Sequence, residues 1–225
     1  MNNLNRIAHL PLNIEFDADR VFKEIQHLNF TPYNSWEEIK SGTSIRSSWD
    51  SVALYSITGT NISDPKEPWV GEFTPTEALK LCPYLCEVLK SLGAGNLLAR
   101  VEGFNPNSSA GWHSHVMESK QPEWISVLQL PIVMPKESKF SVVHFMDYRC
   151  SDFSKSITVY ESTYKPGKVY CFNSYHYHNA FNYGDSPMFT VRVYVDNRGP
   201  MKDILQKSIQ NYTGEYIASS LDLPK

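Results

Sequence analysis

The spacing of apolar residues changes partway along the chain. In the front part, Val21, Ile25 and Leu28 fall on one face of a helix, and the apolar residues of the segment 79–92 follow the same helical spacing. From Leu97 onward apolar residues recur at about every second position, which is the period of a β-strand. The pattern therefore predicts helices in the front part and strands in the second half.

Sequence signals mark where these helices begin and break. Acidic residues precede the first helix, and Thr74 is expected at the N-cap of the second, with Pro75 at its first position. Glu77 stands three residues after Thr74, which completes the pattern of a capping box. Pro83 is expected to kink or split this helix. A short amphipathic helix is also expected over residues 201–209.

Several short segments have the alternation and the β-branched or aromatic content of strands. They are 51–57, 97–104, 125–130, 139–145, 156–160, 168–172 and 189–195. Turn residues separate those of the second half, among them Pro131 and the pair Pro166–Gly167. Short strands at regular spacing are typical of a closed or double-sheet β architecture.

Length and composition favour one folded domain. The chain has 225 residues, of which 41% are hydrophobic and 20% charged, which is enough apolar material for a sizeable core. We expect a single domain over 1–225, with a flanking segment 1–96, a β core 97–199, and a C-terminal helix and tail 200–225. The 13% aromatic content favours strands over helical bundles.

Charge and hydropathy exclude several kinds of partner. The formal net charge of −3 lacks the basic surplus that nucleic-acid binding needs, so no nucleic-acid partner is expected. No apolar run approaches the roughly 18 residues that cross a bilayer, and the first residues do not resemble a signal peptide. A cytoplasmic protein without a membrane partner is therefore expected. Its four cysteines are expected to be free thiols, with a Cys82/Cys86 metal pair as the alternative.

Two His-x-His pairs carry the candidate chemistry. They are His113 with His115, and His176 with His178. Residues two apart in a strand point to the same face, so each pair can direct two imidazoles at one point, and imidazole is the commonest metal ligand in proteins. A single such pair is most often a pair of surface histidines. With two such pairs in one β-rich region, a metal site and surface histidines are equally good interpretations.

The surroundings of these histidines resemble a known family. The order and spacing of motifs from Thr74 to Pro200 resemble the aspartyl/asparaginyl β-hydroxylase-like branch of the Fe(II)/2-oxoglutarate-dependent dioxygenases, which includes bacterial proline cis-hydroxylases. The motifs are Leu81-Cys82-Pro83-Tyr84-Leu85, the turn Asn105-Pro106-Asn107, Leu130-Pro131-Ile132, Pro166-Gly167, His178-Asn179 and Val193-Tyr194-Val195-Asp196.

The resemblance implies a double-stranded β-helix, that is, a cupin-like jelly roll, that binds Fe(II) and uses 2-oxoglutarate as cosubstrate. It implies hydroxylation of an amino acid or a peptide residue. The iron ligands of the family are a histidine, a carboxylate two residues on, and a distal histidine. His113 matches the first histidine and His178 the distal one, while His115 occupies the carboxylate position. Either His115 itself or the nearby Glu118 is then expected to complete the ligand set.

The resemblance also implies an arginine that grips 2-oxoglutarate. The family position of this arginine falls on Thr190, and Arg192 lies two residues along on the same strand face. Arg192 is therefore expected to bind the cosubstrate carboxylate. The alternative is a strand-end arginine that pairs with a surface carboxylate. The family's Arg-x-His on the middle strand is replaced by Val127 and Gln129.

Two other functions remain open on the same residues. One is a non-catalytic or zinc-stabilised jelly-roll binding module, because the carboxylate of the family is missing. The other is a cupin-type enzyme of another reaction class, such as an isomerase, that uses these histidines without a keto acid.

Overall fold

A computed structural model describes residues 4–32, 49–61, 69–95, 97–115, 121–145 and 156–217 of the chain. The helical elements are η1 (Leu4–Arg6), α1 (Ala18–Ile25), α3 (Glu77–Lys80), α4 (Pro83–Ser91) and α6 (Met201–Gln210). The strands are β1 (His9–Glu15), β2 (Thr31–Pro32), β3 (Trp49–Ser56), β4 (Thr74–Pro75), β5 (Ala99–Phe104), β6 (Ser108–Ser109), β7 (Ile125–Val133), β8 (Ser138–Phe145), β9 (Ser156–Ser162), β10 (Lys168–Phe172), β11 (Tyr177–Asn182) and β12 (Met188–Asp196).

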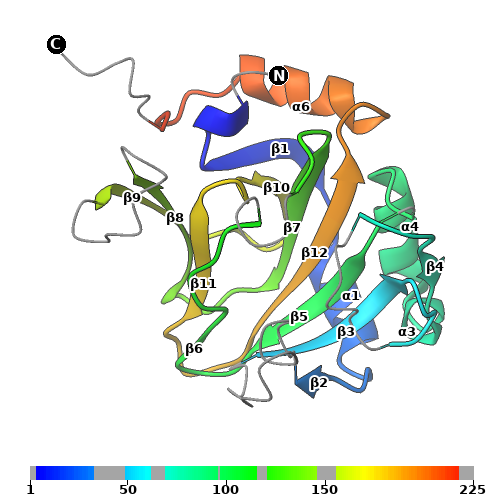
Figure 1. Ribbon diagram of the computed structural model, residues 1–225. Coiled ribbons are helices and arrows are strands. Elements are labelled where there is room, and N and C mark those ends of the chain that lie inside the picture. Colours follow the sequence, from blue (N-terminus) through cyan, green and yellow to red (C-terminus); the bar gives the residue numbers. More distant parts are fainter. Residues whose placement is uncertain are drawn as a thin grey trace, which may run out of the picture.

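The strands form two antiparallel sheets (Figure 1). The larger, eight-stranded sheet has the order β1-β10-β7-β12-β5-β3-β2, and β4 pairs with β3. The smaller, four-stranded sheet has the order β6-β11-β8-β9. All strand segments expected from the sequence are confirmed, as β3, β5, β7, β8, β9, β10 and β12. Strands that neighbour each other in a sheet are mostly distant in sequence, so residues from both halves of the chain meet on one sheet face.

Alternation along the strands gives the larger sheet two different faces. Val191 and Val193 of β12 belong to the core on the helix side, whereas Arg192 between them is buried on the opposite face. Tyr170 and Phe172 of β10 lie on that same opposite face and pack with aromatic and aliphatic side chains of the smaller sheet. Arg192 of β12 is therefore enclosed between the two sheets.

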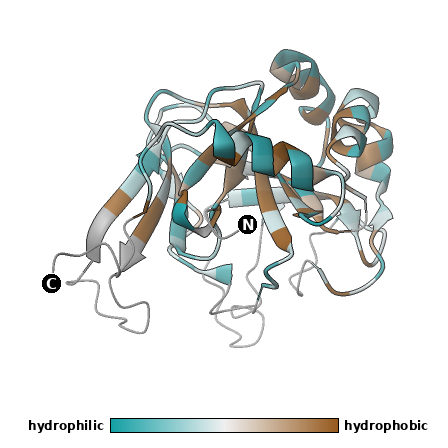
Figure 2. Cartoon of the chain, turned by 90° about the horizontal axis from the view of Figure 1, so that it is seen from above, coloured by the Kyte–Doolittle hydropathy of each residue, from teal (hydrophilic) through white to brown (hydrophobic). Residues whose placement is uncertain are grey.

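Helices cover the outer face of the larger sheet. The helix α1 packs against β7 and α4, and α6 packs across β1 (Figure 1). Met201 and Leu205 of α6 are buried, while the side of this helix that faces the viewer in Figure 2 is hydrophilic. The predicted C-terminal amphipathic helix is thus confirmed. Among the described residues, no helix is long and apolar enough to span a membrane.

The second predicted helix begins differently from expectation. Thr74 and Pro75 form strand β4, and the N-cap is Thr76, whose hydroxyl accepts a hydrogen bond from Leu79 N. The capping box at Thr74 is wrong because Thr74 and Pro75 pair with β3 before the chain turns. Pro83 does split the helical segment, since α3 ends at Lys80 and α4 begins at Pro83 itself.

Two prolines lie inside strands that the sequence did not predict in full. Pro11 lies in β1, a strand missing from the predictions, and this strand is an edge of the larger sheet, where the lost N–H donor is tolerated. Pro131, expected to end a strand, lies within β7 beside a register irregularity of β12 at Phe189 and Thr190. Pro11 therefore marks a sheet edge and Pro131 an irregular register, and neither residue ends its strand.

The N-terminus of α4 is capped by a side chain of another helix. Cys82 at the N-cap makes no side-chain hydrogen bond, but the two carboxylate oxygens of Glu24 accept from Tyr84 N at 2.9 Å and from Leu85 N at 3.0 Å. The negative charge also complements the positive end of the helix.

We expect Glu24→Ala to lower the free energy of unfolding by about 2 kcal/mol, because two backbone donors lose a charged acceptor. Denaturant unfolding measures this change. The matched control is Glu87→Ala, an exposed glutamate on the capped helix α4 itself, with an expected change of at most about 0.5 kcal/mol. Equal effects of the two substitutions would contradict the capping role of Glu24.

Candidate metal centre

Two segments distant in sequence bring three histidines together. His113 forms an isolated antiparallel bridge with His178 of β11, in which His178 N donates to His113 O at 2.9 Å and His113 N to His178 O at 3.1 Å. Two residues on, His115 N donates to Ser174 O at 3.2 Å, so the segment that carries the first pair runs alongside the chain leading into β11. This backbone pairing fixes where the three side chains start.

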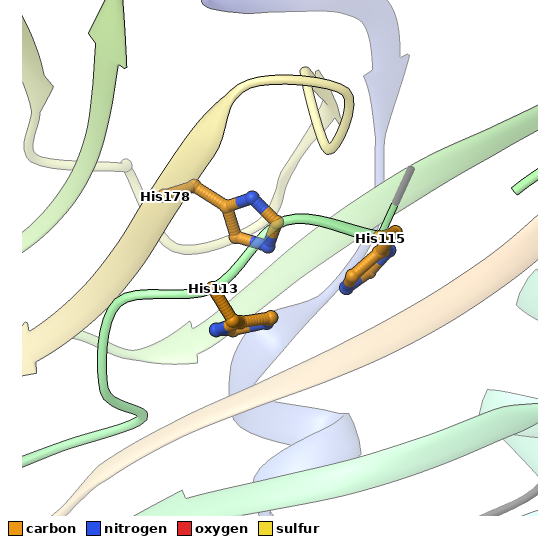
Figure 3. Close-up of side chains that lie close together, drawn as sticks. All are labelled: His113, His115 and His178. Atoms are coloured by element: carbon orange, nitrogen blue, oxygen red, sulfur yellow. The ribbon is translucent and has the colours of Figure 1, made fainter. Parts of the chain in front are cut away.

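The three rings converge on one point (Figure 3). Their centroids lie 4.2 Å apart for His113 and His178, 4.8 Å for His115 and His178, and 5.3 Å for His113 and His115. One ring nitrogen from each histidine lies within 4.8 Å of the corresponding nitrogens of the others. Among the described histidine, cysteine and acidic side chains, these three histidines have the spacing of a metal site.

Hydrogen bonds select the same nitrogen of each ring. The Nδ1 atoms of His113 and His178 lie 2.9 Å from Gly111 O and 2.8 Å from His176 O, and a backbone carbonyl only accepts, so both Nδ1 atoms carry the proton. His115 Nδ1 lies 3.0 Å from the side-chain oxygen of Gln121. In each neutral ring Nε2 is then the lone-pair nitrogen, as metal-binding histidines require.

The surroundings keep these histidines neutral. Burial, and next the positive charge of Arg192, lower the pKa of His113 to about 4. Burial and the neighbouring His113 lower the pKa of both His115 and His178 well below the usual value. Neutral imidazole is the form that binds a metal ion, so the metal-binding state needs no deprotonation near neutral pH.

The donor set fits a transition metal. His178 Nε2 is fully buried and has no hydrogen-bond partner among the described residues, although a buried polar atom without a partner is costly. A metal ion bound by Nε2 would satisfy this atom. Imidazole ligands suit iron, zinc, copper and nickel, so the residues fit the expected Fe(II) and equally fit zinc.

A buried charged cluster lies on the same side of the larger sheet. Arg100 of β5 and Arg192 of β12 are directly opposite each other in the strand register. Their Nε atoms lie 2.9 Å and 3.1 Å from the same oxygen, Oε1 of Glu102, and all three side chains are at most 5% exposed. Arg192 therefore pairs with a buried carboxylate, and the surface ion pair considered as its alternative is wrong.

Gln129 accepts hydrogen bonds from Arg192, and Thr190 fixes the orientation of the Gln129 amide. Because a guanidinium only donates, the Gln129 amide presents its oxygen to Arg192, 2.9 Å from Nε and 3.3 Å from Nη2, and its NH₂ group donates to Thr190 Oγ1 at 3.0 Å. Thr190 in turn donates to Leu130 O at 3.2 Å. Arg192 is thus fixed in the interior, and its charge acts on all three histidines.

Other candidate residues have different places. His176 lies in a bend before β11 and contributes its carbonyl oxygen to the orientation of His178. Glu118 lies outside the described residues. Cys82 is a buried free thiol and Cys86 a partly buried one, as expected.

Sequence reasoning missed three residues of the site. Arg100 and Glu102 fall within the expected strand 97–104 without any predicted role, although a charged pair at alternate positions of an apolar strand is a signal of an enclosed polar face. Gln121 follows the histidine pair by a few residues and has no sequence signal of its own. Its role depends on contacts that form only in the folded chain.

A further histidine, the half-buried His9, lies beside the three-histidine cluster without joining it. His9 Nε2 donates to Tyr160 O at 3.0 Å, and its Nδ1 accepts from the hydroxyl of Tyr164 at 2.8 Å. Its ring stacks on Phe172, which contacts His178 edge-on. Burial lowers the pKa of His9 to about 4.

Stability should therefore fall as the pH drops from about 6.5 to 4, because in this window the unfolded chain binds a proton at His9 that the folded chain does not. Between pH 7.5 and pH 5 we expect a loss of roughly 2 kcal/mol from this residue. His9→Gln should retain the two hydrogen bonds and reduce the pH dependence of the unfolding free energy by that amount. An equal pH dependence of the unfolding free energy in the wild type and in His9→Gln would contradict the lowered pKa of His9.

Comparison with solved structures supports the fold independently of the strand pattern, whereas comparison of sequences finds no match. No protein-family model and no curated protein matches the sequence. A solved 2OG-Fe(II) oxygenase family oxidoreductase from Burkholderia pseudomallei is similar in structure, with a TM-score of 0.57, 11% identity, and 86% of this chain and 88% of that chain covered.

Two enzymes of nogalamycin biosynthesis are similar as well. The non-heme alpha-ketoglutarate-dependent carbocyclase SnoK has a TM-score of 0.53 at 11% identity, over 87% of this chain and 82% of that one. The epimerase SnoN has a TM-score of 0.50 at 12% identity, over 87% and 81%. The chain has the double-stranded β-helix fold. The expected cupin-like jelly roll is thereby confirmed, and the three histidines, His113, His115 and His178, lie between its two sheets, where the charge of Arg192 acts on them.

Proposed function

We propose that this protein is an Fe(II)/2-oxoglutarate-dependent dioxygenase that acts on a small molecule or a peptide. The observation that carries the proposal is the set of three imidazoles, His113, His115 and His178, each oriented to present Nε2 at one point beside the buried Arg192. We further propose that the whole chain, 1–225, forms one domain and acts in the cytoplasm, with no nucleic acid as partner.

The proposed ligand set is His113, His115 and His178, with His115 in place of the carboxylate used by the resembling family. Fe(II) bound there would supply the oxidising chemistry of these enzymes together with O₂ and 2-oxoglutarate. Three neutral ligands leave the double positive charge of the metal uncompensated. Such a centre attracts an anionic cosubstrate more strongly than one with a carboxylate ligand.

Arg192 is the proposed anchor of 2-oxoglutarate. Its planar guanidinium can bind a carboxylate bidentately, and the buried surroundings strengthen such a charged hydrogen bond. Glu102 and Gln129 hold the guanidinium in place before the cosubstrate arrives. This arrangement reduces the ordering cost of binding.

The finer assignment rests on the sequence resemblance. The similar structures are those of an oxygenase, a carbocyclase and an epimerase, so the shared fold supports several reactions. The motifs around His113 and His178 favour the aspartyl/asparaginyl β-hydroxylase-like branch. We therefore propose hydroxylation of an amino acid or of a residue in a peptide.

The test is cosubstrate turnover. Protein loaded anaerobically with Fe(II) is mixed with 2-oxoglutarate, ascorbate and O₂, and succinate formation and O₂ consumption are followed. We expect succinate above the level of free Fe(II), and none when zinc replaces iron. A protein that binds zinc stoichiometrically and forms no succinate with iron would be the zinc-stabilised module instead. Iron binding without any binding of 2-oxoglutarate would favour the cupin-type enzyme of another class.

A further inference from the structure

Gln121 is the side chain that hydrogen-bonds Nδ1 of His115. Its Oε1 lies 3.0 Å from His115 Nδ1 and accepts from Ser174 Oγ at 2.8 Å, and its Nε2 donates to Ile125 O at 3.0 Å. Because the carbonyl of Ile125 only accepts, the NH₂ group of the amide must face Ile125. The oxygen of Gln121 then faces His115, and this fixes the direction of the hydrogen bond.

The backbone closes the same network. His115 N donates to Ser174 O and Gln121 N donates to His115 O, both at 3.2 Å. Gln121 is 5% exposed, His115 7% and Ser174 1%, so water does not compete for these bonds. On its other side the ring of His115 stacks on Tyr194 of β12, with the centroids 5.9 Å apart. The orientation of the ring is therefore fixed by hydrogen bonds at one edge and by packing on one face.

The three histidines differ in what orients them. His113 and His178 donate from Nδ1 to backbone carbonyls, which any residue in that place would supply. Only His115 depends on a side chain for its orientation, and that residue follows it by six positions. The side chain of Gln121 therefore favours the form of His115 in which Nδ1 carries the proton.

We propose that Gln121 is a positioning residue of the metal centre, which holds His115 in the Nδ1–H form so that Nε2 becomes the third metal ligand. The inference rests on the proposed function for the presence of the metal. An amide oxygen accepts from Nδ1–H without carrying a charge, so it orients the ring and leaves it neutral. Hydrogen bonds of this kind typically change metal affinity 10- to 100-fold.

The first test reads the tautomer in the metal-free protein. Long-range ¹H–¹⁵N correlation spectra of the histidine rings distinguish Nδ1–H from Nε2–H. We expect Nδ1–H for His115 in the wild type and in Gln121→Glu, which keeps the acceptor oxygen, and a substantial Nε2–H population in Gln121→Met. Nε2–H in the wild type, or unchanged Nδ1–H in Gln121→Met, would overturn the inference, whatever the fate of the proposed function.

The second test measures metal affinity in a double-mutant cycle. Equilibrium dialysis against Co(II), as a stable stand-in for Fe(II), is expected to show 10- to 100-fold weaker binding for Gln121→Met. In the His115→Ala background the same substitution should have no further effect, because Gln121 acts through His115. An equal loss in both backgrounds would make Gln121 merely structural and overturn the inference.

Controls separate positioning from folding and from the proposed function. Asn197→Leu removes another buried amide that holds the same segment, through Glu123 O and Ser126 Oγ, but touches no histidine. It should leave both the tautomer and the affinity unchanged. Should Gln121→Met fail to fold, Gln121→Leu and Gln121→Glu give the same comparison of lost and retained acceptor. A wild type that binds no Co(II) would overturn the proposed function together with the ligand role of His115.

Discussion

Replacing His178 with alanine is expected to weaken Fe(II) binding by at least about 100-fold and to reduce succinate formation to the level of free iron. Loss of a residue that only orients a metal ligand already costs 10- to 100-fold in affinity, and His178 is a proposed ligand itself. It is 1% exposed, and its Nε2 has no other partner in the described part of the chain. Metal content after dialysis and succinate formation together measure the effect.

The matched control is His176→Ala, two residues earlier in the same segment. His176 orients His178 through its backbone carbonyl, which alanine retains. This variant should bind iron with wild-type affinity. Thermal unfolding of both metal-free proteins identifies any general loss of structure. Equal iron affinity of wild type and His178→Ala would contradict the metal centre.

Replacing Arg192 with glutamine is expected to weaken 2-oxoglutarate binding about 100-fold or more, with iron binding retained. Removing one partner of a buried, charged hydrogen bond costs roughly 2–5 kcal/mol, which corresponds to a factor of about 30 to several thousand. Arg192 is 3% exposed, so we expect little access of water to replace the lost contact. The affinity of Arg192→Lys for 2-oxoglutarate should fall between those of the wild type and Arg192→Gln, because lysine keeps the charge and loses the planar fork.

The control for Arg192 is Arg198→Gln. Arg198 follows the same strand but is exposed and paired with Asp196 at the surface, so its loss should change the affinity for 2-oxoglutarate by less than about twofold. Isothermal titration of the Fe(II)-loaded, oxygen-free proteins measures these affinities. Unchanged binding in Arg192→Gln would move the anchor to another group, and Arg100, opposite Arg192 in the strand register, would be the first to test.

The local part of the fold was predictable because it depends on neighbours in sequence. The helix with Val21 and Ile25, and strands such as β5 and β12, follow directly from apolar spacing. The strand β1 has the same alternation in Leu10 and Leu12, but Pro11 obscures it. Only the position of β1 at a sheet edge, a tertiary feature, makes this proline acceptable.

The clustering of the three histidines was predictable from the sequence, whereas the residues that hold them in place were not. The spacing of His113, His115 and His178 together with their motifs identified the cluster that the structure brings together. The pairing of Arg192 with Glu102, by contrast, depends on the register between β5 and β12, strands about 90 positions apart in the chain. No local pattern encodes such a register, so residues that hold functional groups in place are found only in the folded structure.

X-ray absorption spectroscopy of the Fe(II)-loaded protein tests the metal centre most directly. The fine structure counts the imidazole rings bound to iron, and three are predicted in the wild type. Two are predicted after His115→Ala, and likewise after His113→Ala. An iron spectrum without imidazole scattering, or one that none of the three histidine substitutions changes, would contradict a metal centre built from His113, His115 and His178.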